Sequence, residues 1–177
     1  DVSNIKPSEV NTDHGIRVGE DSAPVKVIEF INLACPYCKK WYEESREVLR
    51  SYVNNGEVQR VIKLFDKDKA SLRKGNVIHH YMNYNVPGQA IEEMDFFFAH
   101  QDEWTALDED EIPAYVEEKR GLVYQPYETE IQGIKDEADR ANVVLVPSVF
   151  VKDFVFDEQI SPQQLQDFIN QELEKTK

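Results

Sequence analysis

VKVIEFINLACPYC, residues 25–38, contains the strongest structural signals in the chain, a predicted buried strand followed by a predicted helix start. Its first half, Val25–Ile31, is a run of β-branched and aromatic residues that predicts a buried strand. Its second half predicts the start of a helix, because Pro36 suits a first helical position, where its missing N–H costs nothing. Two cysteines, Cys35 and Cys38, therefore lie where a buried strand turns into a helix.

The residues on either side extend this pattern into a βαβ unit. Apolar residues recur at helical spacing until Asn54-Asn55-Gly56, which ends the predicted helix. Alternating residues 58–65 then predict a second central strand, and a short strand is expected at 15–18. The order strand, helix, strand indicates a parallel pair at the centre of a sheet.

The second half of the chain is first helical and then returns to strands. Helical periodicity covers residues 70–85, 88–100, 111–120 and 127–141. A strand is expected at 143–152 with a hairpin partner at 154–156, and Ser161-Pro162 would open a last helix. The predicted order is therefore β-α-β, a helical block, then β-β-α.

Composition and charge exclude several classes of protein. The 177 residues include 20 Lys plus Arg and 34 Asp plus Glu, so the net charge is −14, and the interval between Lys74 and Lys119 contains no Lys or Arg. This balance argues against nucleic-acid binding and against docking on anionic lipid, and no apolar run is long enough for a membrane span. We expect a monomer whose acidic stretch is either a solvated face or a surface that favours basic partners.

The cysteine pair carries the expected chemistry. A thiolate on Cys35 would lie among the unpaired N–H groups of a helix start, and such placement lowers a cysteine pKa to roughly 3.5–7.5. Cys38 is close enough to form a disulfide, and we expect it to be the more buried thiol that attacks a mixed disulfide. Pro36 would stiffen the turn, whereas Tyr37 adds no cation.

Two alternatives are that the cysteines bind zinc or that they have no chemical role. Zinc needs two more ligands, and the adjacent His79 and His80 would not both point easily at one metal from one helix. We expect no metal and no cofactor. Apolar residues near the motif could form a docking surface, although Phe30 and Trp41 also suit a plain core; the candidates are Phe30, Leu33, Tyr37 and Trp41.

Two further residues point to redox chemistry. Glu29 lies inside the apolar strand, where burial would raise its pKa and let it exchange protons with the buried thiol, unless it is an ordinary glutamate at an edge. Pro147 follows Val146 at the head of a strand-like run, which indicates an edge, a strand start or a special bend. A cis bond would suit this position.

Together these residues resemble the thioredoxin superfamily, and in particular the DsbA-like thiol–disulfide oxidoreductases. The resemblance rests on VKVIEFINLACPYC, the helical block and VPSVFV with its hairpin and terminal helix, and it covers nearly the whole chain. It implies an α/β thioredoxin fold with a large α-helical insertion. Residues 1–68 and 143–177 would form the thioredoxin-like domain, and residues 69–142 the inserted helical domain.

The resemblance also assigns roles to residues. It implies that Pro147 is cis and faces the disulfide, and that Val146 presents its backbone to a bound peptide. The expected catalytic residues are Glu29, Cys35, Pro36, Tyr37, Cys38 and Pro147, and the expected substrate-binding residues are Val146 and Pro147. The expected partners are protein or peptide thiols and an unidentified redox-recycling partner.

The motif departs from the best-known DsbA pattern, which has Pro-His where this chain has Pro36-Tyr37, as glutaredoxins do. We therefore predict a reduction potential between those of thioredoxin and DsbA, about −270 to −120 mV. One alternative is a glutaredoxin-like, glutathione-dependent reductase, but residues 148–159 lack the glycine pair that glutaredoxins carry there. Another is a non-catalytic thioredoxin-like binding module. The hydrophilic start without a signal peptide favours a cytoplasmic protein, with an exported protein whose signal sequence was removed as the alternative.

Overall fold

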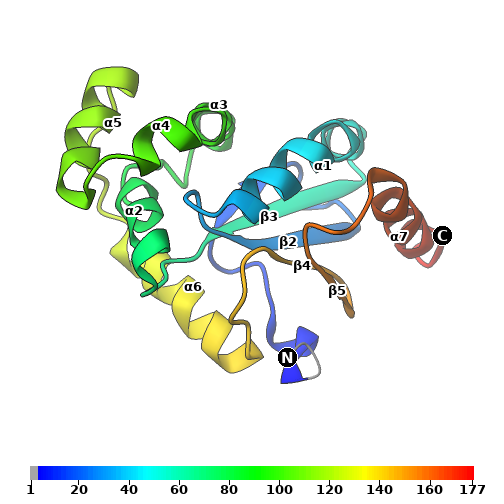
Figure 1. Ribbon diagram of the computed structural model, residues 1–177. Helices are drawn as coiled ribbons and strands as arrows, with labels where there is room; N and C mark the ends of the chain where they lie inside the picture. Colours follow the sequence, from blue (N-terminus) through cyan, green and yellow to red (C-terminus); the bar gives the residue numbers. More distant parts are fainter. Residues whose placement is uncertain (1–3) are drawn as a thin grey trace.

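A five-stranded sheet forms the centre of the computed structural model, which describes residues 4–177 (Figure 1). The strand order is β1-β3-β2-β4-β5. The central pair, β2 and β3, is parallel, with a register that runs from Val25 opposite Val58 to Ile31 opposite Leu64. The predicted βαβ unit is therefore confirmed. The strands are β1 (Ile16–Val18), β2 (Val25–Ile31), β3 (Val58–Leu64), β4 (Ser148–Val151) and β5 (Phe154–Phe156).

Helices cover both faces of this sheet and gather at one side of it. The helices α1 (Pro36–Asn54) and α7 (Pro162–Glu174) pack against each other, and α6 (Glu128–Ala141) lies on the opposite face from α1 (Figure 1). The remaining helices of the block cluster beside α1; they are α2 (Ala70–His79), α3 (Pro87–Ala99), α4 (Gln101–Thr105) and α5 (Ile112–Arg120), with short 3₁₀ turns at η2 (Pro7–Glu9) and η3 (Glu109–Glu111). Within residues 4–177, no helix is both long and apolar enough to cross a bilayer.

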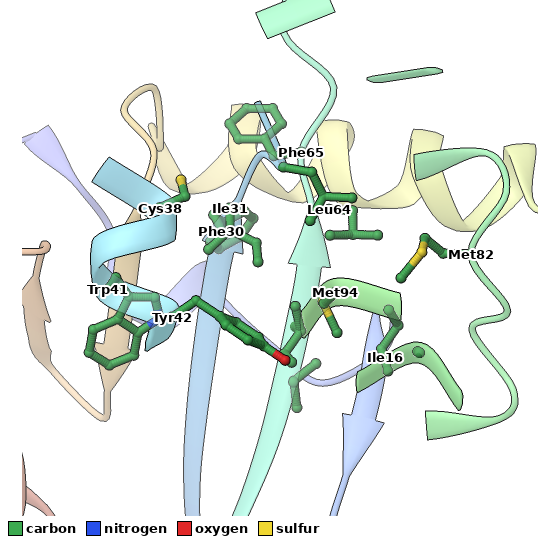
Figure 2. Packing of buried hydrophobic residues seen from close by; sticks show 14 of the residues in the cluster. Ile16, Phe30, Ile31, Cys38, Trp41, Tyr42, Leu64, Phe65, Met82 and Met94 are labelled. Atoms are coloured by element: carbon green, nitrogen blue, oxygen red, sulfur yellow. The ribbon is translucent and has the colours of Figure 1, made fainter. Parts of the chain in front are cut away.

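The core forms where α1 lies on the central strands. Trp41 and Tyr42 project from α1 toward the strands, and Phe30 and Ile31 come from β2 (Figure 2). Phe30 meets both Phe65 and Phe150 edge to face, with 5.9 Å between ring centroids in each case. Phe30, Leu33 and Trp41 are all buried, so the core role is confirmed for Phe30 and Trp41.

The helical block is tied to the sheet by a buried ion pair. Lys63 of β3 lies 2.8 Å from the carboxylate of Glu137 of α6, and neither side chain is accessible to solvent. The second carboxylate oxygen of Glu137 accepts the backbone N–H of Asn11 at 3.0 Å. Burial lowers the pKa of Lys63, so the neighbouring carboxylate is needed to hold its charge.

Two expected boundaries were wrong, and one helix was not expected. The strand expected at 143–152 begins only at Ser148, because Asn142 ends α6 in the left-handed conformation (φ 61°) and the chain then turns outward. The helix expected at 70–85 ends at His79. His79 and His80 both contact Asp66. Adjacent side chains of a continuous helix point about 100° apart, so these two contacts to one carboxylate favour an end of the helix at His79. The polar residues 101–105 form a helix that no apolar pattern announces.

Candidate active site

The two cysteines lie at the start of α1, as expected. Cys35 is the extended residue that precedes the helix, Pro36 follows at its first position, and Cys38 lies in the first turn. The side chain of Asn32 shapes the approach, since its Oδ1 accepts the N–H of Ala34 at 2.9 Å. Both thiols are free, with Cys35 5% exposed and Cys38 fully buried.

The surroundings of Cys35 favour its thiolate. A hydrogen bond from the Cys38 thiol lowers the pKa of Cys35 from 9.0 to about 6, against burial, which raises it. The backbone N–H groups of Cys38 and Tyr37 add to the lowering, while the charge of Glu158 opposes it. The direction is the one expected from the helix start, but the largest favourable contribution comes from the second thiol.

Cys38 has the opposite character. Burial raises the pKa of Cys38 well above its ordinary value, and the hydrogen bond to Cys35 raises it further. The N–H of Asn32 donates to Cys38 Sγ at 3.4 Å and offsets part of this effect. The pKa values of the two thiols are therefore shifted in opposite directions, and Cys35 is the thiol that ionises more readily.

The Val146–Pro147 segment reaches Cys35. The Val146–Pro147 peptide bond is cis. The carbonyl oxygen of Val146 lies 3.7 Å from Cys35 Sγ, so two segments 111 residues apart in sequence meet at the reactive sulfur. Pro147 immediately precedes β4, which makes it a strand start rather than part of an edge strand.

A groove of about 450 Å³ runs along the cis-proline segment. We call it the active-site groove, and it is lined by Tyr37, Leu145, Val146, Pro147, Ser148, Val155, Phe156, Asp157 and Glu158. Tyr37 is 61% exposed and Leu145 is 66% exposed. Large apolar side chains that face water beside a reactive thiol are typical of a surface that contacts another molecule.

Glu29 is buried, but it is not isolated. Its carboxylate accepts hydrogen bonds from Trp41 Nε1 at 2.9 Å and from Arg60 Nε and Nη2 at 2.8 Å each. Glu29 is therefore not an ordinary glutamate at an edge, and it is a buried carboxylate with hydrogen-bond partners. Its role in proton transfer stays a prediction, because none of its hydrogen bonds within residues 4–177 reaches either sulfur.

The helical block supplies two residues, Gln101 and His79, whose contacts with the cysteine turn were not predicted from the sequence. Gln101 of α4 donates from Nε2 to the carbonyl oxygens of Leu33 at 2.8 Å and Cys35 at 3.1 Å. The N–H of Leu33 in turn donates to His79 Nε2 at 3.2 Å, and His79 Nδ1 lies 2.7 Å from Asp66. Through these two contacts His79 links the cysteine turn to Asp66.

The chain is similar to known proteins. The thioredoxin family model matches residues 11–171. A conserved protein of unknown function from Enterococcus faecalis V583 is 45% identical, with a TM-score of 0.94, and the match covers 96% of this chain and 97% of that one. None of the curated proteins matches significantly.

More distant structures share the fold. BdbD from Bacillus subtilis is 16% identical with a TM-score of 0.62, over 97% of this chain and 96% of its own. A protein-disulfide isomerase from Novosphingobium aromaticivorans is 16% identical with a TM-score of 0.68, over 92% of this chain and 99% of its own. The expected thioredoxin fold with a helical insertion, as in DsbA-like proteins, is confirmed. The chain belongs to the thioredoxin family.

Proposed function

We propose that the protein is a thiol–disulfide oxidoreductase that exchanges disulfides with protein or peptide thiols through Cys35 and Cys38. The observation that carries this proposal is the contrast between the two thiols. The pKa of Cys35 is lowered to about 6, while that of Cys38 is raised well above its ordinary value. A thiolate is the nucleophile in disulfide exchange, so this contrast assigns attack to Cys35.

In the reducing direction, the Cys35 thiolate attacks a substrate disulfide. One substrate sulfur leaves as a thiolate and the other joins Cys35 in a mixed disulfide. Cys38 then loses its proton and attacks Cys35 Sγ, which releases the second substrate thiolate and closes the Cys35–Cys38 disulfide. Two electrons pass from the protein to the substrate, and the oxidising direction is the reverse of these steps.

The cis-proline segment would align the substrate. The Val146 carbonyl lies 3.7 Å from Cys35 Sγ, so a peptide chain in the active-site groove would pass beside Val146 with its sulfur close to Cys35. In this proposal Val146 and Pro147 bind substrate backbone, and Pro36 and Tyr37 shape the approach to Cys35. Glu29 is proposed to assist proton transfer indirectly, from within its ion pair with Arg60.

The lowered pKa of Cys35 favours exchange over the binding-module alternative, which predicts an ordinary thiol. The glutathione-dependent alternative lacks such support, because residues 148–159 form a glycine-free hairpin segment beside the groove.

Trapping tests the proposal directly. Cys38→Ala should accumulate a mixed disulfide through Cys35, because nothing resolves it, and Cys35→Ser is the matched control that should trap nothing. The parent protein should also reduce insulin and equilibrate with glutathione. If Cys38→Ala traps no partner and the parent shows no disulfide exchange, the proposed function is wrong.

A further inference from the structure

We propose that the active-site groove selects polypeptide substrates that carry Lys or Arg close to the reacting cysteine. The inference rests on the proposed function and adds a substrate class to it. The groove has an apolar part and an acidic part. Tyr37, Leu145 and Phe156 provide apolar surface, and Asp157 and Glu158 follow Phe156 directly in the chain.

Glu158 lies within electrostatic reach of both sulfurs. The charge of Glu158 raises the pKa of both Cys35 and Cys38. A carboxylate that acts on both sulfurs would also act on a charged side chain of a substrate whose own sulfur is bonded to Cys35. The groove would therefore contact the substrate residues on either side of that cysteine.

Within residues 4–177, no cation of the protein forms an ion pair with the carboxylate of Asp157 or Glu158. Lys40 comes close to this segment, but its Nζ donates to the backbone carbonyl of Glu158 at 2.8 Å and pairs with the carboxylate of Glu44 at 2.8 Å. The Asp157 carboxylate accepts only the N–H of Gln159, at 2.9 Å.

A basic substrate residue would complete this site. It would pair with the carboxylates of Asp157, which is exposed, and Glu158, which is half-buried. A basic substrate residue would also offset the charge of Glu158, which raises the pKa of Cys35. A lower pKa makes Cys35 a better leaving group when a second substrate thiolate attacks the mixed disulfide. An acidic substrate residue at the same place would be repelled.

The test uses the oxidised full chain and three dithiol peptides. The peptides share an apolar residue beside the first cysteine and differ only in the next residue, which is Lys, Gln or Glu. One substrate thiolate attacks Cys35 and displaces Cys38, and the second displaces Cys35, so the peptide is oxidised and the protein pair is reduced. We expect the Lys peptide to react about fivefold faster than the Glu peptide at low salt, with Gln between them, and the ratio to fall at high salt.

A double variant tests whether the preference for the Lys peptide arises from the two carboxylates of the groove. Asp157→Asn with Glu158→Gln should bring the Lys-to-Glu ratio close to one, and the ratio cancels any change in the intrinsic reactivity of Cys35. The matched control is Glu117→Gln with Glu118→Gln, which removes the same charge from exposed positions of α5 and should keep the preference. Equal rates for all three peptides in the parent, or a preference that survives in the groove variant, would overturn the inference. Absence of reaction with every peptide would instead refute the proposed function.

Discussion

At the scale of single residues, two thiols three positions apart have opposite properties because one is the hydrogen-bond donor of the other. The Cys38 thiol stabilises the Cys35 thiolate, and the same bond keeps the proton on Cys38. Spacing alone predicts that the residues meet, and the helix start predicts which one ionises. How far apart the pKa values of the two thiols lie depends on the complete burial of Cys38, which could not be predicted from the sequence.

The lowered pKa of Cys35 predicts a pH dependence for the reduced protein. A group whose pKa falls on folding adds stability that is present above its unfolded pKa and is lost as the pH falls through its folded pKa. We therefore expect the free energy of unfolding of the reduced form, relative to the disulfide form, to decrease as the pH falls from 9.0 to about 6. Denaturant titrations of both forms would measure this, and the rate of Cys35 alkylation should fall over the same step at about pH 6. A difference that stays constant with pH would contradict the lowered pKa.

The same value predicts the reduction potential. A Cys35 pKa of about 6 lies between the values of roughly 7 in thioredoxin and 3.5 in DsbA. A more stable thiolate favours the reduced pair and makes the disulfide more oxidising, so the potential should lie between about −270 and −120 mV. Equilibration with glutathione buffers measures it, and a value outside this interval would contradict the prediction.

Glu29 offers a test of its buried ion pair. Glu29→Gln leaves Arg60 with no compensating charge in a site closed to solvent, so we expect a loss of about 3–5 kcal/mol in the free energy of unfolding. Glu109→Gln is the control, because its pair with Arg73 is exposed and should be worth at most about 1 kcal/mol. Similar losses in the two variants, measured by urea unfolding, would refute the special role of the buried pair. The sequence placed Glu29 inside, but its partner depends on the register of β2 and β3, which no local pattern encodes.

At the scale of elements, the cysteine turn is held by helices that come from the inserted block. Gly75 of α2 lies so close to this turn that a Cβ there would be 2.1 Å from Asn32 Oδ1 and 2.7 Å from the N–H nitrogen of Ala34. Gln101 of α4 holds the carbonyls on the other side. The periodicity predicted α2, but α4 has only five residues with a single buried apolar side chain, Trp104, which is too few to form an apolar pattern.

Gly75→Ala tests this support. Alanine normally favours a helix over glycine by about 1 kcal/mol, but here the new methyl group must displace the cysteine turn, which we expect to cost about 1–3 kcal/mol net and to slow disulfide exchange. Gly88→Ala is the matched control, because it lies in α3 with nothing within 4 Å of the added Cβ. Urea unfolding and exchange rates of both variants give the comparison. A Gly75→Ala protein as stable and as active as Gly88→Ala would show that α2 does not position the turn.

At the scale of the whole molecule, residues 69–142 are joined to the rest of the chain by many side-chain contacts, including those that reach the cysteine turn. The domain boundaries that we proposed, with residues 69–142 as an inserted unit, follow the change from strand to helix patterns. The contacts cross those boundaries repeatedly. Lys63 pairs with Glu137, Tyr42 Oη donates to Asp95 at 2.8 Å, and Lys39 Nζ donates to the carbonyl of Phe98 at 2.8 Å. Pattern reasoning finds where an insertion begins, but whether it folds as a separate body depends on long-range contacts of this kind.

These contacts predict that the two units unfold together. The chain has two tryptophans, and one lies in each unit: Trp41 in α1 and Trp104 in α4, both buried in one continuous apolar core. Trp104→Phe leaves a fluorescence probe of the thioredoxin-like part, and Trp41→Phe leaves a probe of the insertion. In each variant we expect the fluorescence midpoint in urea to coincide with the midpoint of far-UV circular dichroism, because a single cooperative transition gives the same curve by every probe. If the Trp104 signal changed at lower urea than the circular dichroism, the insertion would be a separately unfolding unit. The cysteine turn would then lose the support of Gln101 and His79 before the sheet unfolds, and exchange activity should decline with the Trp104 signal.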